Sequence, residues 1–249
     1  MGNDGHDKKR DMTYTQNREL SWLRFDERVL AESMDESVPL FERLKFIAIF
    51  ESNMREFLMV RMGGLSSLAT LKRQPRDNKS GMTPSEQVAA VFSELPGLFS
   101  KASASLDAIE SLLRAKGIER ITPPELIGTE RDTVRSYFNR NVQPIFSPLI
   151  IDPRHPFPNL RNGALYVVCT LASASEDEQG LLGIIEVPTS LPRVIEVSNE
   201  NGLLRYILLE DIILACLDSC FGAYAPQDSA VIRVTRNADL DPDGEGVEE

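Results

Sequence analysis

The sequence predicts an α+β protein in which a helical region is followed by a region of mixed helices and strands. Its 249 residues, of which 42% are hydrophobic, are enough to bury one large core or two ordinary ones. Apolar residues recur at helical spacing up to about Ala115, whereas from Ile118 onward short apolar runs are bounded by proline, glycine, asparagine and serine. We therefore expect two domains with a boundary near residues 107–118.

The expected domain limits follow from composition. We expect a polar leader over residues 1–13, a helical domain over 14–117, a head domain over 118–238 and a disordered acidic tail over 239–249. The leader has almost no apolar side chains, and the tail combines six acidic residues with glycine and proline, so neither can offset the entropy cost of folding. Because the head domain ends in this tail, we expect its last elements to be missing.

The first two helices of the helical region have recognisable starts. Asn17 is suited to cap the first helix, in which apolar residues recur at helical spacing over 20–30. Pro39 suits the first turn of the second, which is apolar nearly all round and should therefore be buried. Gly63 and Gly64 are expected to weaken this second helix.

A third, longer helix is predicted to follow. Thr83 and Glu86 have the spacing of a capping box, with a proline at the first helical position between them. The helix should extend to about Ala115, and Gly117 should end it. Because a proline removes a backbone donor, we expect a kink or two shorter helices at Pro96–Gly97.

The second region contains both element types. Strands are predicted from the apolar runs 164–171, 181–187 and 194–197, and helices from the patterns at 129–142 and 208–221. This mixture is typical of an α+β arrangement.

The charge of the chain argues against nucleic acid as a partner. The formal net charge is -11, with 15 basic and 16 acidic residues in 1–107 but 12 basic and 22 acidic residues in 108–249. A surface that neutralises nucleic-acid phosphates has the opposite sign. No apolar run is long enough for a membrane-spanning helix, and the N-terminus does not have the pattern of a signal peptide.

The cysteines predict a reduced, cytoplasmic protein. Cys169, Cys216 and Cys220 are odd in number and lie in apolar surroundings, which favours free thiols. Cys216 and Cys220 are four residues apart on a predicted helix, but neither a histidine nor a further cysteine lies nearby. We therefore expect no metal site.

The sequence offers no catalytic residue. It contains neither of the glycine-rich phosphate-binding motifs and no nucleophile motif. Of the two histidines, His6 lies in the leader, and His155 lies between two prolines and is interpreted as a structural contact near Phe157. Glu210 and Asp211 are adjacent on a helix, so we expect cap or surface charges and not a general acid and base.

The most suggestive polar segment is SNMREF at 52–57, which lies between two apolar stretches. Asn53 presents a hydrogen-bond donor and acceptor side by side, a pairing that suits the edge of an adenine base. The alternative is a capping box formed by Asn53 and Glu56 where one helix ends and another begins. Composition alone favours the capping box.

Read together, several segments resemble the N-terminal part of the bacterial polyphosphate kinase family. They are NRELSWLRFDERVL (17–30), PLFERLKFIAIFESNMREFLMVRMGGL (39–65), VQPIFSPLIIDPRHPFPNLRN (142–162), EVP and LPR around 186–193, YILLEDII (206–213) and VTRNADLD (234–241). The segments occur in the same order as in the family and span residues 14 to 241.

The resemblance implies a helical domain followed by a head domain similar to the phox-homology fold. It also implies an enzyme that reversibly transfers the terminal phosphate of ATP to inorganic polyphosphate through a phosphohistidine, with Mg2+, as a homo-oligomer that pairs through its head. Asn53 falls on the family's nucleotide-contacting asparagine in an SN-x-x-EF pattern, so the resemblance favours the adenine interpretation. The helical domain would then cover the adenine ring.

The chain also departs from the family pattern. Arg55 stands where the family usually has an acidic residue, Glu51 where it has a small polar one, and Pro96–Gly97 interrupts a helix that is normally unbroken. The domains that carry the phosphohistidine, the phosphate-binding arginines and the Mg2+ site have no counterpart in this chain. The resemblance therefore implies a portion of a polyphosphate kinase that is inactive alone and binds ATP weakly or not at all.

Two alternatives belong to other functional classes. A phox-homology-like head could recognise a phosphorylated lipid headgroup as a free-standing module, although the acidic second region argues against it. The chain could also be a partner subunit that pairs through its head with a catalytic protein. An incomplete sheet exposes an edge, so we expect dimerisation or poor solubility.

Overall fold

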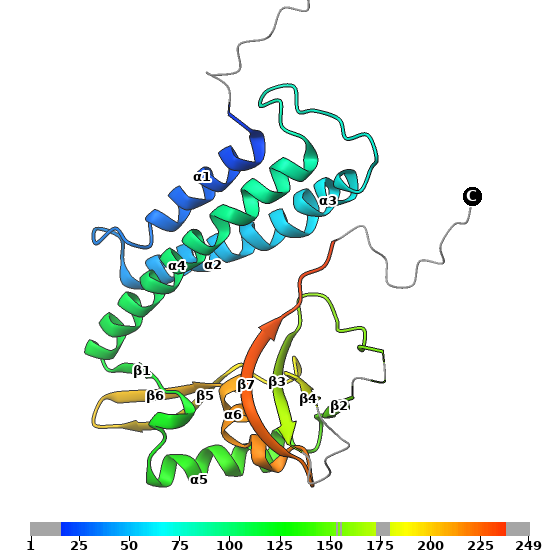
Figure 1. Cartoon of the computed structure of the whole chain (residues 1–249). Coiled ribbons are helices and arrows are strands. Elements are labelled where there is room, and N and C mark those ends of the chain that lie inside the picture. Colours follow the sequence, from blue (N-terminus) through cyan, green and yellow to red (C-terminus); the bar gives the residue numbers. More distant parts are fainter. Residues whose placement is uncertain (1–15, 153, 155, 173–179, 238–249) are drawn as a thin grey trace, which may run out of the picture. The chain divides into compact units, whose positions relative to one another are not determined.

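The computed structural model describes residues 16–152, 154, 156–172 and 180–237. The chain divides into two compact units: one ends at Ile109 and resumes at Arg236, and the other comprises Glu110–Thr235. The first unit is helical and the second mixes helices with strands, so the predicted α+β class is confirmed (Figure 1). The predicted leader, the acidic tail and His155 lie outside the described residues.

The helical unit contains α1 (Arg18–Ala31), α2 (Leu40–Glu56), α3 (Gly63–Ala69) and most of α4 (Pro84–Ala115) (Figure 1). The predicted cap of α1 is confirmed, because the side chain of Asn17 accepts hydrogen bonds from the backbone N–H groups of Glu19 at 2.9 Å and Leu20 at 3.2 Å. Pro39 occupies the N-cap position of α2, one residue before the helix.

A π-helix at Phe57–Met62 joins α2 to α3, so helical structure continues past the glycine pair. Single π-turns inside helices are frequent at functional sites. Gly63 is buried at this junction, and a Cβ atom added there would lie 2.1 Å from Oδ1 of Asn237. A side chain at this position would therefore displace the Asn237 side chain, where the sequence suggested only a weak point.

The long helix begins as predicted. A carboxylate oxygen of Glu86 accepts from the backbone N–H of Thr83 at 2.7 Å, and the Thr83 hydroxyl accepts from the N–H of Glu86 at 3.3 Å. The helix ends before Gly117, whose φ of +83° is a conformation that glycine adopts without strain.

Of the two alternatives expected at Pro96–Gly97, two shorter helices are excluded because α4 runs through both residues as one helix, and a kink stays a prediction. Proline leaves the carbonyl of residue 92 without its helical partner, but Phe92 and Pro96 lie on the exposed face, where water can bond to that carbonyl. The buried side chains of Leu95 and Leu98 hold the opposite face of the helix in the core.

The second unit contains two sheets. A three-stranded sheet has the order β1-β6-β5, with β1 (Ile118–Arg120) parallel to β6 (Leu203–Leu208) and β5 (Val194–Glu200) antiparallel to it. A four-stranded antiparallel sheet has the order β2-β4-β3-β7, formed by β2 (Leu149–Ile151), β3 (Leu165–Ala172), β4 (Leu181–Glu186) and β7 (Ala225–Arg233) (Figure 1).

The three predicted strands are confirmed as β3, β4 and β5, whereas the others were not predicted. Strands β1 and β2 have only three residues each, too few for a pattern to be visible. Strand β7 is long but mostly exposed, so its sequence lacks the apolar run on which the prediction depended.

The helices of this unit cover part of its core. The pattern at 129–142 forms α5 (Gly128–Tyr137) and a π-helix at Phe138–Val142, which confirms that prediction. The second predicted helix is shorter than expected: α6 is Leu209–Ala215, and a 3₁₀ turn at Leu217–Ser219 follows. A short 3₁₀ turn also occurs at Pro123–Glu125.

Strand β3 packs against apolar clusters on both faces, although Thr170 is exposed, and this agrees with its nearly continuous apolar sequence. On one face Val167 and Cys169 join the main core with α5 and α6. On the other face Tyr166 packs with Leu160 and Ile184 in a smaller cluster. Within the described parts of the chain, none of the helices is long and apolar enough to cross a membrane.

Candidate functional site

Three side-chain pairs connect α1 with α2 and the π-helix that follows it. Glu19 pairs with Arg61, Trp22 with Phe57, and Asp26 with Asn53. As the residue number rises on α1 it falls on the partner segment, so the two run in opposite directions. The predicted site residue Asn53 therefore lies in an ordered row of contacts.

The side chain of Asn53 bonds to α1 and does not cap a helix. Its Nδ2 donates to Oδ1 of Asp26 at 2.9 Å. Helix α2 continues through Asn53 to Glu56, and no bond links the Asn53 side chain to the backbone of Glu56 among the described residues. The capping-box interpretation is therefore wrong, because no helix begins at this point.

Asp26 is the residue at this site that sequence reasoning missed. Its side chain is fully buried, and its second carboxylate oxygen, Oδ2, has no hydrogen-bond partner among the described residues. Burial raises the pKa of Asp26 from 3.8 to about 6, the bond from Asn53 opposes the rise, and the charge of Glu51 adds to it. The sequence did contain a signal for Asp26, because it is a charged residue on the apolar face of the first helix.

An aromatic pair lies one helical turn from Asn53. The rings of Trp22 and Phe57 are stacked, with centroids 4.2 Å apart and an angle of 6° between the planes. Trp22 precedes Asp26 by four residues and Phe57 follows Asn53 by four, so each aromatic ring lies on the same helix face as its polar neighbour. This stack fixes the spacing of the two helices beside the polar pair.

An ion pair lies beyond the aromatic pair. Arg61 contacts both carboxylate oxygens of Glu19, with Nη2 to Oε1 at 2.6 Å and Nε to Oε2 at 3.3 Å. The Glu19 carboxylate is buried and the Arg61 side chain is half-exposed. Two-point contact of this kind holds both side chains in one orientation.

Two of the three departures from the family pattern lie on the outer side of α2. Glu51 and Arg55 are both exposed, and Arg55 forms no ion pair with any described residue. Glu51 acts on the site through its negative charge, which raises the pKa of Asp26.

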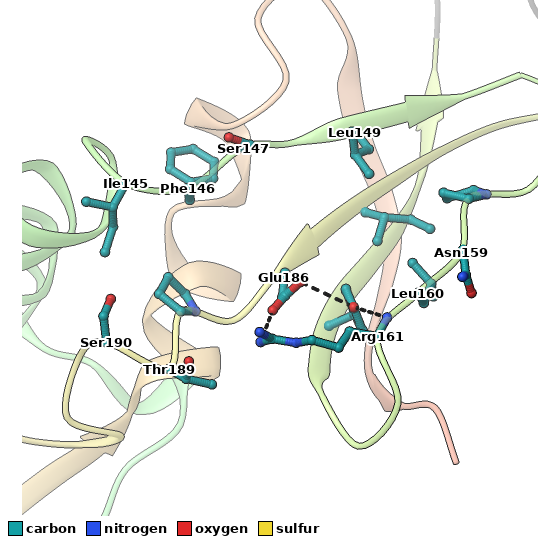
Figure 2. Close-up of a pocket in the computed structure, with 14 residues that line it drawn as sticks. Ile145, Phe146, Ser147, Leu149, Asn159, Leu160, Arg161, Glu186, Thr189 and Ser190 are labelled. Atoms are coloured by element: carbon teal, nitrogen blue, oxygen red, sulfur yellow. Dashed lines mark hydrogen bonds and ion pairs between the residues drawn. The ribbon is translucent and has the colours of Figure 1, made fainter. Parts of the chain in front are cut away.

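A second candidate is a hollow of about 470 Å³ in the head unit, shown in Figure 2. Its wall combines apolar side chains such as Phe146 and Leu149 with the ion pair between Arg161 and Glu186. The Tyr166 hydroxyl accepts from the backbone N–H of Arg161 at 2.8 Å and donates to Glu186 at 3.3 Å. Burial raises the pKa of Tyr166. Because Glu186 already neutralises Arg161, this hollow does not suit a phosphate group.

Other arginines of the head unit are also engaged by carboxylates. Arg120 pairs with Asp211 at 3.1 Å, and Arg193 forms an ion pair with Glu210. Arg205 contacts Glu119 at 2.9 Å and also pairs with Glu130. These guanidinium groups link elements of the head unit, and each is already paired with a carboxylate.

The expectation that Glu210 and Asp211 are cap or surface charges is wrong. Both lie in the first turn of α6 but are only 4% and 7% exposed, and neither caps the helix. Burial raises the pKa of Asp211, which the contact with Arg120 opposes. Each carboxylate has its own arginine, so both take part in ion pairs that connect elements of the head.

Two arginines without an ion pair to a described residue line a further hollow of about 380 Å³. Arg131 donates from Nε to the carbonyl of Leu126 at 2.8 Å, and Arg135 lies four residues further along α5. Apolar side chains form the remaining wall. At this hollow no described carboxylate forms an ion pair with the two guanidinium groups.

The three cysteines are buried and unbridged. Burial is the main cause that raises the pKa of Cys220 to about 12, with smaller effects from the neighbouring thiols and Asp218. Its thiol donates to the carbonyl of Cys216 at 3.4 Å. The described residues contain no group of three or more metal-ligating side chains, and the position of His155 is outside them.

Comparison with known proteins adds a family relationship to this geometry. Residues 15–121 match the family described as the polyphosphate kinase N-terminal domain, and residues 129–249 match the polyphosphate kinase middle domain. A polyphosphate kinase of Bacillus cereus is 38% identical over 240 residues, which are 95% of this chain and 34% of that protein. A polyphosphate kinase of Mycobacterium avium is 36% identical over 234 residues, covering 90% and 32%.

A solved structure is similar as well. The crystal structure of polyphosphate kinase from Porphyromonas gingivalis matches 91% of this chain and 33% of its own, with a TM-score of 0.79 and 29% sequence identity. The chain thus spans about a third of the length of the relatives that it matches.

Proposed function

The chain belongs to the polyphosphate kinase family, and on this premise we propose that it forms the base-covering and head part of an enzyme that transfers the terminal phosphate of ATP to inorganic polyphosphate. In this proposal the helical unit provides a wall for the adenine base, with Asn53 as the residue that reads it. The enzyme is cytoplasmic, which agrees with three unbridged cysteines.

The observation that supports this role is the arrangement around Asn53. Its amide nitrogen is held by a buried carboxylate, while its Oδ1 has no hydrogen-bond partner among the described residues. An amide so anchored offers an acceptor and a second donor to a base at little cost in side-chain entropy. The stacked pair of Trp22 and Phe57 and the π-helix keep the wall rigid beside it.

The chemistry of phosphoryl transfer belongs, in this proposal, to the two thirds of the family's length that this chain does not match. Stabilising a transferring phosphoryl group requires converging cations. In the head, Arg120, Arg193 and Arg205 are paired with carboxylates. Arg131 and Arg135 line a separate hollow, and the described residues contain no group of three or more metal-ligating side chains. The chain alone is therefore expected to be inactive. Its dissociation constant for ATP is expected to lie above the micromolar range.

The first experiment determines the intact mass of the protein from its native cells and its ATP-dependent polyphosphate synthesis. A mass well above 27.8 kDa with activity supports the proposal. Activity at 27.8 kDa would show that the chemistry resides in this chain and would overturn the assignment of roles. A micromolar ATP affinity of the chain alone would also contradict it.

A second experiment tests Asn53 in the polypeptide that the cells produce. Because a base contact is present in both the ground state and the transition state, Asn53→Ala is expected to raise the KM for ATP and leave kcat nearly unchanged. The matched control is Ser52→Ala, at the exposed neighbouring position. An unchanged KM in the Asn53 variant would remove this residue from the nucleotide site.

Homo-oligomerisation through the head is a further part of the proposal. Strands β2 and β7 lie at the two edges of the four-stranded sheet, and Leu149 and Ile150 of β2 are exposed. Exposed strand edges with apolar side chains favour pairing with another chain. Light scattering at increasing concentration should give a dimer, and a monodisperse monomer at high concentration would count against it.

Recognition of a lipid headgroup, or of a phosphate by a free-standing module, is the competing hypothesis. The arginine pairing described above argues against it, and the hollow beside Arg131 and Arg135 is where such binding would be sought. Sedimentation with vesicles of anionic lipid at physiological salt separates the two hypotheses. The proposed function predicts that the chain stays in the supernatant. Co-purification with a separately encoded catalytic protein would instead identify a partner subunit.

A further inference from the structure

Asp26 carries a polar atom whose burial requires an explanation. The side chain is 0% exposed, its Oδ1 accepts the bond from Asn53, and its Oδ2 has no hydrogen-bond partner among the described residues. A buried carboxylate without a full set of partners lowers the stability of a protein. A neutral side chain of the same shape would avoid this cost, so the carboxylate at this position has an energetic disadvantage that packing does not explain.

The chemistry of the pair gives the carboxylate a role. An ionised carboxylate only accepts hydrogen bonds, so it admits the amide nitrogen of Asn53 and repels the amide oxygen. Asp26 therefore selects one of the two orientations of the amide. In that orientation Oδ1 and the second N–H of Asn53 remain for a ligand, because neither has a partner among the described residues.

We propose that Asp26 is a positioning residue that turns the amide of Asn53 so that its Oδ1 selects a 6-amino purine over a 6-oxo purine. Adenine presents an N–H donor at position 6 beside a ring-nitrogen acceptor. The donor matches Oδ1 of Asn53, and the ring nitrogen matches the second N–H of the Asn53 amide. A 6-oxo purine presents an acceptor at the same position, so it would face Oδ1 with two acceptors in contact. This inference rests on the proposed role of Asn53 in base binding and adds to it the origin of base selectivity.

The surroundings hold this arrangement in place. The Trp22 and Phe57 stack fixes α1 against the π-helix on one side of the pair. The buried side chains of Leu30 and Phe50, about one helical turn away, lie on its other side. With both flanks packed, the amide can reverse only by turning in place and not by moving away from the carboxylate.

The protonation state of Asp26 provides a signature of this role. The charged side chains on the surrounding helices include Arg24, Glu27 and Arg28 on α1, Glu51, Arg55 and Glu56 on α2, and Glu94 and Lys101 on α4. Lys101 pairs with Glu27, and Glu51 adds to the effect of burial, so that the pKa of Asp26 is about 6. Below that pH a protonated Asp26 can donate to Oδ1 of Asn53, and the orientation is no longer fixed.

One arm of the test needs no nucleotide. In the 249-residue chain, the side-chain amide signals of Asn53 in a 15N-edited NMR spectrum should shift with pH, with a midpoint near 6. The variant Asp26→Asn, which keeps the shape of the side chain, should abolish that midpoint, whereas Glu27→Gln on the same helix should keep it. An Asn53 amide that does not respond to pH in this range would overturn the proposed orientation by Asp26.

The other arm measures base selectivity in the polypeptide that the cells produce, with ATP and ITP as alternative phosphate donors. Asp26→Asn should reduce the ratio of kcat/KM for ATP to that for ITP by about 10-fold, the size of effect expected when one bidentate base contact is lost. Glu27→Gln should leave the ratio unchanged. In the parent protein the ratio should also fall as the pH is lowered through 6.

The outcomes separate this inference from the proposed function. If Asn53→Ala changes the KM for ATP but Asp26→Asn leaves the ATP-to-ITP ratio unaltered, the positioning role is wrong and the base-binding role stands. If Asn53→Ala changes nothing, the proposed base contact fails and the inferred selectivity fails with it. The NMR titration then still decides whether Asp26 orients the amide.

Discussion

The indole ring of Trp22 on α1 lies nearly parallel to the phenyl ring of Phe57, with ring centroids 4.2 Å apart. Phe57 is almost fully buried at the start of the π-helix, whereas Trp22 is partly exposed. Trp22 is the single tryptophan of the chain, so its fluorescence reports on this junction alone. The contact joins α1 to the segment that carries the candidate base-reading residue.

Replacing Phe57 should destabilise the helical unit. Phe57→Leu removes the stacked contact and leaves part of its volume unfilled, so the free energy of unfolding should fall by about 1–3 kcal/mol. Urea denaturation followed by Trp22 fluorescence and by far-UV circular dichroism measures the change. The same substitution at Phe41, which is 57% exposed, should change stability by less than about 0.5 kcal/mol. Equal losses in the two variants would contradict the assigned role of the stack.

The buried carboxylate should make stability depend on pH in a definite direction. The pKa of Asp26 is raised in the folded state from 3.8 to about 6, so the folded chain binds this proton more tightly than the unfolded chain does. The contribution of Asp26 to the free energy of unfolding is therefore most favourable below pH 4 and falls by up to about 3 kcal/mol as the pH rises through 6.

Asp26→Asn isolates that contribution from other titrating groups. The variant should be more stable than the parent chain at pH 8, and the difference should disappear near pH 4. Urea denaturation of both proteins across this range measures the difference. A variant that is less stable than the parent at pH 8 would show that the charge of Asp26 stabilises the fold, contrary to this prediction.

Gly183 in β4 lies against a side chain from another part of the head. A Cβ atom added at this position would lie 2.4 Å from the Phe221 ring and 2.8 Å from the Cys169 sulfur. Gly183→Ala should therefore reduce the free energy of unfolding by about 1–3 kcal/mol, and combining it with Phe221→Leu should recover part of the loss. Gly97→Ala is the control, for which the change in the free energy of unfolding should have the opposite sign. A Cβ atom added at Gly97 would have no atom within 4 Å, so the substitution should stabilise α4 by about 0.5–1 kcal/mol.

Arg205 joins three elements of the head through its charge. It contacts Glu119 of β1 and Glu130 of α5 from its own position in β6, and only 16% of its side chain is exposed. Arg205→Met would leave the buried Glu130 carboxylate without an ion-pair partner, whereas Glu119 would keep its contact with Arg114 at 2.9 Å. We expect a loss of about 3 kcal/mol in the free energy of unfolding. Removing Lys45 from its exposed pair with Glu42 should cost less than about 0.5 kcal/mol. Similar effects of the two substitutions would show that the Arg205 contacts behave as ordinary surface pairs.

The cysteines should be unreactive in the folded protein. Burial raises the pKa of Cys169, Cys216 and Cys220, so little thiolate is present near neutral pH. Titration with a thiol-specific disulfide reagent at pH 8 should be slow in native buffer and should release three equivalents quickly in denaturant. Rapid reaction of one thiol in native buffer would locate an opening of the head core.

Local signals account for the parts of the fold that the sequence predicts well. The caps at Asn17 and Thr83 are confirmed because each depends on bonds within three residues. The central strands β3 and β4 are confirmed because both are buried and their apolar runs are nearly continuous. Local signals did not decide between a kink and two separate helices at Pro96, because the effect of a proline depends on whether the orphan carbonyl faces water, which is decided by how the helix packs.

The sequence by itself determined the α+β class, the order of helical and mixed regions, and the family, through caps, apolar periodicity and motifs that are read along the chain. Only the tertiary structure placed Asp26 against Asn53, residues 27 positions apart, and gave each of the buried carboxylates of Glu210 and Asp211 an arginine partner. The reason is physical: a carboxylate's pKa and bonding depend on burial and on neighbours brought in from other elements. Those neighbours are set by packing in three dimensions and leave no periodic trace in the sequence.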